Sequence, residues 1–289
     1  YSELPEIPVE IFSESTLKTG SQTSESLEIK SPKPVKSDKY AFIQLPENLE
    51  LPVCQGFSQG EDHQIRKFQN YTICYRESYE QAEWAAYCLK KSELEKNVSR
   101  GNNFHPDPEI TTGSASLSDY KKSGYDRGHL APAADFAFSE EAMSESFFMS
   151  NMSPQVPELN RETWQYLEAQ VRRWAEQYGK IYVVTGPLLE KSSESYNSIG
   201  ENKVAVPEFF YKVILAPVIE NSQTPETSTA CSDIKTIGFI LPNEKCSKNF
   251  MNYAGTVDEV EKRSGLDFFS LLPDQIENQT EAVLKAETL

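Results

Sequence analysis

Three long apolar runs in the second half of the chain constrain its fold more than any other feature. They occupy residues 180–185, Phe209–Val218 and 236–241, and they are rich in the β-branched and aromatic residues that are typical of strands. An amphipathic pattern over residues 164–178 predicts a helix before them, and a shorter helix is expected at Val257–Ser264. Strands that follow one another in runs, with the helices kept apart, indicate an α+β fold.

Other segments give weaker signals. Residues 69–77 alternate polar and apolar side chains and are expected to form a strand. Residues 80–91 are ambiguous, because their alanines favour a helix. Residues 220–232 are rich in Ser, Thr and Glu and are expected to form a mobile loop. Gly265 is placed to end the helix at Val257–Ser264.

Residues 1–45 differ in composition from the rest of the chain. They are rich in Ser, Glu, Lys, Thr and Pro and show no sustained periodicity. Such a segment cannot bury enough surface to offset the entropy lost when it becomes ordered, so we expect a disordered or extended N-terminal tail. The remaining residues, 46–289, are then one domain. No window approaches the ~18–20 apolar residues needed to cross a bilayer, so no membrane span is expected.

The charge and the cysteines restrict the function. The net charge of −16 over 289 residues argues against a protein that only grips nucleic acid, but it leaves room for a local basic groove. The five cysteines show no C-x-x-C or other zinc spacing, so zinc is disfavoured. Cys231 and Cys246 would form a disulfide if the protein is exported, and the alternative is that all five are reduced thiols.

The tetrapeptide Asp126-Arg127-Gly128-His129 combines residue types suited to catalysis. Histidine is the usual general base near pH 7, although a lone histidine in a polar run is more often a surface residue. Gly128 allows a tight turn or the close approach of a substrate. Asp126 and Arg127 could be an exposed ion pair, or the planar guanidinium could face a phosphate.

Asn160 begins the expected helix and follows a polar stretch that contains Asn151 and Gln155. Asparagine is a favoured helix N-cap, but its amide oxygen is also a hard ligand suited to Mg²⁺. Glu168 lies eight positions further along, which is ~12 Å of helical rise and too far for easy ligation of the same ion. It is better suited to orient metal-bound water, with a solvated helix carboxylate as the alternative.

With its flanks, residues 125–136 and 147–168, this pattern resembles the DNA/RNA non-specific endonucleases. These are ββα-metal nucleases that include endonuclease G and secreted bacterial nucleases. The resemblance extends from about Tyr71 to Phe269. It implies a central antiparallel sheet with packed helices and a ββα-metal catalytic element, and it makes residues 80–91 a strand. Four further runs carry it: residues 182–187, 206–212, 238–243 and 264–269.

The resemblance also assigns roles to the site residues. His129 would be the general base, and Asn160 would be the one direct protein ligand of a hydrated Mg²⁺, for which Mn²⁺ or another divalent ion could substitute. Glu168 would contact the hydration shell of that ion. Asn151 would help to arrange the site.

Two arginines complete the implied site. Arg127 would support the site or the phosphate, and Arg100 resembles the phosphate-stabilising arginine of the family. A surface cation is the alternative for Arg100, because its distance along the chain from the next aromatic residue is longer than usual.

The implied activity is hydrolysis of DNA and RNA to 5′-phosphate and 3′-hydroxyl ends. Two alternatives stay open, namely an inactive nuclease-like module that binds nucleic acid or protein, and a metal phosphodiesterase that acts on small nucleotides. A homodimer and an inhibitor protein are partners that the resemblance leaves open. We expect a secreted or periplasmic protein rather than a cytoplasmic one.

Overall fold

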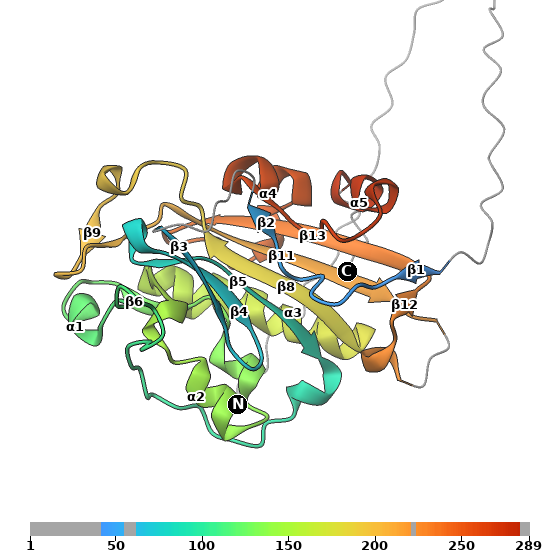
Figure 1. Ribbon diagram of the computed structural model, residues 1–289, viewed down its shortest axis with the longest axis horizontal. Helices are drawn as coiled ribbons and strands as arrows, with labels where there is room; N and C mark the ends of the chain where they lie inside the picture. The colour runs from blue at the N-terminus through green and yellow to red at the C-terminus, as the bar shows by residue number, and fades with distance from the viewer. Residues whose placement is uncertain (1–41, 55–61, 221–223, 284–289) are drawn as a thin grey trace, which may run out of the picture. The chain divides into compact units, whose positions relative to one another are not determined.

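A seven-stranded, fully antiparallel sheet organises the folded part of the chain (Figure 1). The computed structural model describes residues 42–54, 62–220 and 224–283. In spatial order the strands are β14 (Ala254–Gly255), β13 (Asp233–Pro242), β11 (Phe209–Val218), β8 (Lys180–Pro187), β5 (Gln81–Lys90), β4 (Thr72–Arg76) and β3 (His63–Lys67). The predicted α+β class and central antiparallel sheet are confirmed.

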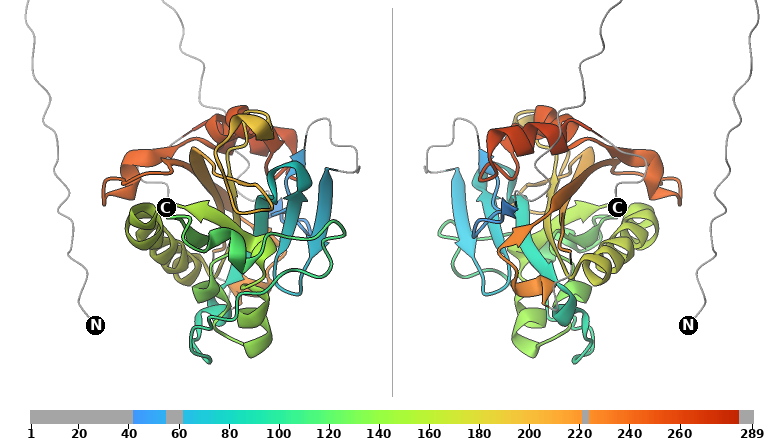
Figure 2. Two further views of the ribbon diagram at one scale, coloured as in Figure 1. Left: turned by 90° about the vertical axis from the view of Figure 1, so that its left-hand side faces the viewer. Right: turned by 90° about the vertical axis from the view of Figure 1, so that its right-hand side faces the viewer.

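Helices cover both faces of this sheet (Figures 1 and 2). On one face, Phe210 and Ile214 of β11 pack in the same core cluster as the apolar side of α3 (Trp164–Tyr178). On the other face, Val213 packs in the cluster that includes α4 (Val257–Ser264). Alternate residues of one strand therefore support two separate layers, as the period of a strand requires.

The remaining elements are short. Four small two-stranded sheets are formed by β1 (Ile43–Gln44) with β12 (Ala230–Cys231), β2 (Val53–Cys54) with β15 (Leu266–Asp267), β6 (Asp126–His129) with β7 (Met152–Gln155), and β9 (Ser198–Ile199) with β10 (Val204–Ala205). The other helices are α1 (Leu117–Tyr120), α2 (Glu140–Glu145) and α5 (Asp274–Glu281). A π-helical turn, Leu159–Thr163, leads directly into α3.

Most of the elements expected from the sequence are present, and one ambiguity is resolved. Residues 80–91 contain a long strand, β5, and not a helix. Ala82, Ala85 and Ala86 are buried between neighbouring strands, so tertiary packing overrides their helix propensity. α4 ends at Gly265, whose φ of 72° lies in the left-handed region as expected for a helix C-cap.

Two expectations about the chain's organisation need correction. Residues 1–41 of the expected tail lie outside the described residues, but Ile43–Gln44 already pair with β12 and Leu45 is buried. The folded part therefore begins before residue 46. The expected loop at 220–232 contains a 3-10 turn, Pro225–Thr227, and the strand β12, because that strand closes the small sheet with β1.

The disulfide alternative is wrong. Cys231 and Cys246 are both free thiols, as is Cys88. Cys231 belongs to the core cluster on the α4 side of the sheet, whereas Cys246 belongs to the cluster on the α3 side. The sheet separates the two thiols, so they cannot approach to the distance of a disulfide bond.

Candidate active site

A two-stranded ribbon followed by a helix builds the candidate site. β6 pairs antiparallel with β7, and His129, the last residue of β6, lies opposite Met152. The chain then enters the π-helical turn that carries Asn160 and continues into α3. Strand, strand and helix follow in the order expected for a ββα element, and they place Asn160 and the first two residues of the tetrapeptide, Asp126 and Arg127, at one cleft.

Asn160 is held through its side-chain amide. Nδ2 donates a hydrogen bond of 2.9 Å to the carboxylate of Asp126. The same carboxylate accepts two bonds from Arg161, at 2.8 and 2.6 Å, and these bonds, with that from Asn160, outweigh burial and lower the pKa of Asp126. Because Nδ2 is engaged, Oδ1 is the atom left free to bind a ligand, and Asn160 lines the cleft.

Two alternatives for these residues are excluded by this arrangement. Asn160 is not an N-cap, because it lies within the π-helical turn and its backbone N–H donates to the carbonyl of Val156. Asp126 and Arg127 do not form an ion pair, since Asp126 pairs with Arg161. The neighbour in sequence is not the partner, because Arg161 reaches the carboxylate of Asp126 from the π-helical turn with two hydrogen bonds.

His129 is a buried imidazole, only 6% exposed. Its ring centroid lies 5.0 Å from that of Phe147 and 5.7 Å from that of Phe104. Burial, assisted by the charges of Arg100 and Arg127, lowers the pKa of His129 to about 3, against a hydrogen bond to the backbone of Arg127. The ring is therefore neutral at pH 7, and its Nε2 has no hydrogen-bond partner among the described residues.

Two guanidinium groups stack on the aromatic rings that enclose His129. The Cζ atom of Arg127 lies 4.0 Å from the centroid of Phe104, and that of Arg100 lies 5.4 Å from the centroid of Phe147. Both arginines line a cleft of about 510 Å³. The other lining residues are Asn102, Phe104, Leu117, Tyr120, Lys121, Tyr125, Asp126 and Asn160. The cleft is thus locally basic in an acidic chain, since its one carboxylate, Asp126, is already bonded to Arg161 and Asn160.

Glu168 lies on α3 and is half-buried, so it is not a solvated surface carboxylate. Burial raises its pKa to about 7, while the positive charges of Lys212, Arg172 and Arg100 act in the opposite direction and Asp135 adds to the rise. Glu168 does not line the cleft, but the charge of Arg100, which does, acts on it.

Lys212 was missed by the sequence reasoning. It is fully buried on β11, with Nζ 2.5 Å from Thr185 Oγ1 and 5.1 Å from the Trp164 ring. Burial lowers its pKa to about 8, and the carboxylates of Glu168 and Asp135 oppose that shift. A signal was present, because Lys212 occupies a position of an apolar strand where the alternation calls for a core residue, beside Phe210 and Ile214.

Asp135 and Arg172 belong to the same buried network. Arg172 Nη1 donates to Asp135 Oδ1 at 2.7 Å, and the hydroxyl of Tyr87 donates to Asp135 Oδ2 at 2.7 Å. Asp135 is thereby satisfied on both oxygens. Among these buried carboxylates, Glu168 is therefore the one that the positive charge of Lys212 chiefly stabilises in its ionised form.

Asn151 and Gly128 shape the site without facing it. Asn151 is fully buried, and its side chain exchanges two 2.9 Å hydrogen bonds with the backbone of Ala131 and donates a third to Ser146, so it fixes the segment after His129. A Cβ at Gly128 would lie 2.2 Å from Gln155 Oε1. Gly128 is thus needed for the close approach of a side chain and not for a turn.

Comparisons with known proteins agree with this geometry. The family model of DNA/RNA non-specific endonucleases matches residues 53–275. The mitochondrial Nuclease 1 of Schizosaccharomyces pombe is 43% identical over 62% of this chain and 56% of its own length. The mitochondrial nuclease of Saccharomyces cerevisiae is 33% identical over 74% of this chain and 68% of its own length. The chain thus spans little more than half of the first relative.

A solved structure is also similar. It is the crystal structure of a complex between EndoG and EndoGI, described as showing the mechanism of EndoG inhibition. It matches with a TM-score of 0.65 and 31% identity, over 77% of this chain and 92% of that chain.

These relatives overturn the expected location. Both fungal nucleases are mitochondrial by name, which contradicts a secreted or periplasmic protein. Sequence reasoning had no signal for this, because a location is not written in the residues of a catalytic domain. Within the described residues, no helix has the length and apolar character that crossing a bilayer requires.

Proposed function

This chain belongs to the DNA/RNA non-specific endonuclease family, and on that premise we propose that it hydrolyses DNA and RNA with the help of a divalent metal ion. The family predicted from the sequence is thereby confirmed. One observation carries the proposal: the amide of Asn160 and two guanidinium groups line one basic cleft, and the neutral, unpartnered imidazole of His129 is buried against Phe104, which also lines it.

The residues present fit a hard divalent cation. The Oδ1 atom of Asn160 is a neutral oxygen donor, and its orientation is fixed because Nδ2 donates to Asp126. We propose Mg²⁺ as the ion, with Mn²⁺ as a substitute, held directly by Asn160 and through its waters by Glu168. When bound, the ion would offset the negative charge that develops on the phosphate oxygens and the leaving oxygen.

His129 would act as the general base. It is neutral at pH 7, and since Nε2 lacks a partner, the bond to the backbone of Arg127 belongs to Nδ1 and orients the ring. Nε2 would take a proton from water, whose oxygen attacks phosphorus in line while the bond to the 3′ oxygen breaks. The departing 3′ oxygen would take a proton from a second water molecule, so the products would be a 5′-phosphate and a 3′-hydroxyl. Because Nε2 is enclosed, the side chains over it must shift when substrate and water enter.

Arg100 and Arg127 would bind the scissile phosphate. Their planar guanidinium groups suit phosphate oxygens, and the rings of Phe147 and Phe104 hold them at the cleft. Contacts to phosphate and not to base edges explain a lack of sequence preference. The acidic remainder of the chain favours a weak grip and ready release of product.

Location and partners follow from the relatives. Since the two fungal relatives are named mitochondrial, we propose that this chain acts in mitochondria. The similar solved structure is a complex of EndoG with EndoGI, so an inhibitor protein is a proposed partner here. The expected homodimer stays a prediction, which sedimentation of the purified protein would test.

The proposal is tested by incubating the purified protein with plasmid DNA and with RNA, in Mg²⁺ and in EDTA. It predicts that both polymers are cut in Mg²⁺ only, and that the new ends are 5′-phosphorylated. Binding without cleavage would instead support the inactive module. Preferential cleavage of a dinucleotide would support the phosphodiesterase of small nucleotides.

A further inference from the structure

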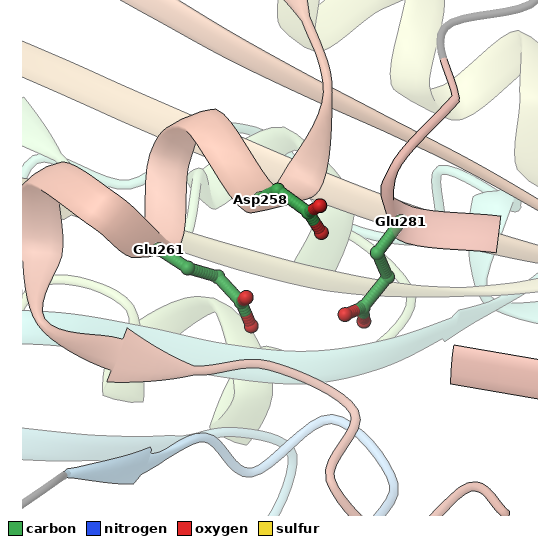
Figure 3. A group of neighbouring side chains, drawn as sticks. All are labelled: Asp258, Glu261 and Glu281. Atoms are coloured by element: carbon green, nitrogen blue, oxygen red, sulfur yellow. The ribbon is translucent and has the colours of Figure 1, made fainter. Parts of the chain in front are cut away.

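Three carboxylates meet on the face of the sheet that lies away from the cleft. Asp258 and Glu261 belong to α4, and Glu281 is the last residue of α5. One oxygen of each lies within 4.8 Å of the chosen oxygens of the other two. In Figure 3 the three side chains extend from the two helices into the same gap. Like charges this close repel one another unless something between them is positive.

Glu281 distinguishes this group from an ordinary acidic patch. Asp258 is exposed and Glu261 is half-buried, and a pair three residues apart on a helix would by itself mean little. Glu281 reaches that pair from a different helix and is only 3% exposed. Its Oε1 is buried without a hydrogen-bond partner in the part of the chain that the structure describes. A buried carboxylate oxygen without a partner is costly, so its persistence points to a ligand.

Among the described residues, none of the three carboxylates forms an ion pair with Lys or Arg. Arg263, also on α4, pairs with Glu190 at 2.8 Å. The charged groups that act most strongly on Glu281 are all acidic, namely Glu261, Glu277, Asp258 and Asp267.

We propose that Asp258, Glu261 and Glu281 bind a hard divalent cation, Ca²⁺, which fastens α5 to α4. All donors are carboxylate oxygens, which favour Ca²⁺ or Mg²⁺ over softer metals. Opposite ligands of Ca²⁺ are about 4.6–5.2 Å apart and those of Mg²⁺ about 4.0–4.2 Å, so oxygens within 4.8 Å of one another suit the larger ion better.

The surroundings leave room for such an ion. Glu261 Oε1 accepts a 2.8 Å hydrogen bond from the backbone of Phe268, which fixes this side chain and leaves its other oxygen available. Because Asp258 is exposed, water can complete the coordination shell. α5 is also tied to the sheet by a bond from Thr236 Oγ1 to the carbonyl of Thr280 at 2.6 Å. The cation would therefore add a second tie, between α5 and α4, to the bond that holds α5 at β13.

Thermal unfolding of the EDTA-treated full chain, followed during a Ca²⁺ titration, tests the site. We expect the Tm to rise by about 5–10 °C at ~100 times the Kd. Glu281→Gln keeps the shape but removes a charge, so it should raise the Tm in EDTA and remove the Ca²⁺-dependent rise. Asp258→Asn, at an exposed position that cannot disturb packing, should weaken Ca²⁺ binding at least ~10-fold by calorimetry.

Two control variants separate this site from other causes. Glu176→Gln makes the same change at an exposed position of α3 and should keep the full rise in Tm. Asn160→Ala removes the proposed metal ligand of the catalytic site and should also keep the full Ca²⁺-dependent rise in Tm. The test therefore does not depend on the proposed function. The inference is overturned if Ca²⁺ does not bind, if Glu281→Gln binds it as wild type does, or if Asn160→Ala alone removes the effect.

Discussion

The side-chain amide of Asn160 donates a 2.9 Å hydrogen bond to the carboxylate of Asp126, the first residue of the tetrapeptide that ends in His129. This bond joins the strand that carries the proposed base to the helix that carries the proposed metal ligand. It also decides which atom of the amide is free. Arg161 in turn holds the carboxylate with two hydrogen bonds, so the orientation of Asn160 depends on residues from both elements.

Removing that acceptor should weaken the metal site. In Asp126→Ala the amide of Asn160 can rotate, so we expect the affinity for Mg²⁺ to fall about 10–100-fold, as is typical when the partner of a metal ligand is lost. Excess Mg²⁺ should restore part of the cleavage rate. Arg161→Gln is the matched control, because it keeps the bond between Asn160 and Asp126. It should therefore lower the affinity for Mg²⁺ by less. Equal effects in the two variants would contradict this assignment.

Gly128→Ala should disturb the ribbon through one side chain. The added Cβ would lie 2.2–2.5 Å from three atoms of Gln155, so either Gln155 or the strand must move. We expect the Tm to fall by several degrees, because overpacking costs about 1–3 kcal/mol. Gln155→Ala removes the obstacle, so the double variant should be more stable than Gly128→Ala alone. A strictly additive loss in the double-mutant cycle would show that backbone conformation is the cause.

Lys212→Met should shift the acid limb of the pH–rate profile. The positive charge of Lys212 lowers the pKa of Glu168, which burial raises to about 7. Without that charge the carboxylate protonates at a higher pH, so cleavage at pH 7 should fall and recover in more alkaline buffer. The profile of kcat/KM against pH measures this, with circular dichroism to verify folding. A uniform loss at every pH would mean that Lys212 acts only on stability.

Because the imidazole of His129 is buried in its neutral form, lowering the pH should destabilise the folded chain. The pKa of His129 is about 3 in the folded chain and about 6.5 when unfolded, so the unfolded state binds the additional proton between these values. The contribution of the neutral His129 ring to stability is complete above pH 6.5 and is lost as the pH falls towards 3. Between pH 7.5 and 5.5 this group alone should remove about 1.4 kcal/mol from the free energy of unfolding.

His129→Asn isolates that contribution. Denaturant titrations at pH 7.5 and 5.5 should show a smaller acid loss in the variant than in the wild type, by about 1.4 kcal/mol. The other titrating groups are common to both proteins, so their contributions cancel in the comparison. An identical loss in the two proteins would show that the ring is exposed enough to take up a proton in the folded state.

The sequence predicted the elements whose pattern is local. β8, β11 and α4 are recognisable from their own residues, because apolar runs and a glycine cap do not depend on distant contacts. β5 was ambiguous from its residues alone, because its alanines suit a helix and only the neighbouring strands select the extended form. The resemblance to a family resolved that ambiguity.

Contacts between distant segments explain the rest of what was missed. The residue beside Asp126 in sequence is Arg127, yet its partner in the fold is Arg161, 35 positions away. Likewise nothing in the sequence joins Glu281 to Asp258, because two helices must dock before their carboxylates meet. Residue types at a site can be read from a motif, but the groups that orient and charge it depend on tertiary structure.

The most direct measurement of the central claim is a Mg²⁺ titration of cleavage by wild type, His129→Ala and Asn160→Ala, with metal binding measured by calorimetry. If His129 only accepts a proton, His129→Ala binds Mg²⁺ like wild type and stays inactive at every concentration, with partial recovery in imidazole if the cavity admits it. Asn160→Ala binds Mg²⁺ weakly and regains part of its cleavage rate when Mg²⁺ is in excess. A loss of Mg²⁺ affinity in His129→Ala as large as in Asn160→Ala, or full activity of either variant, would contradict the account.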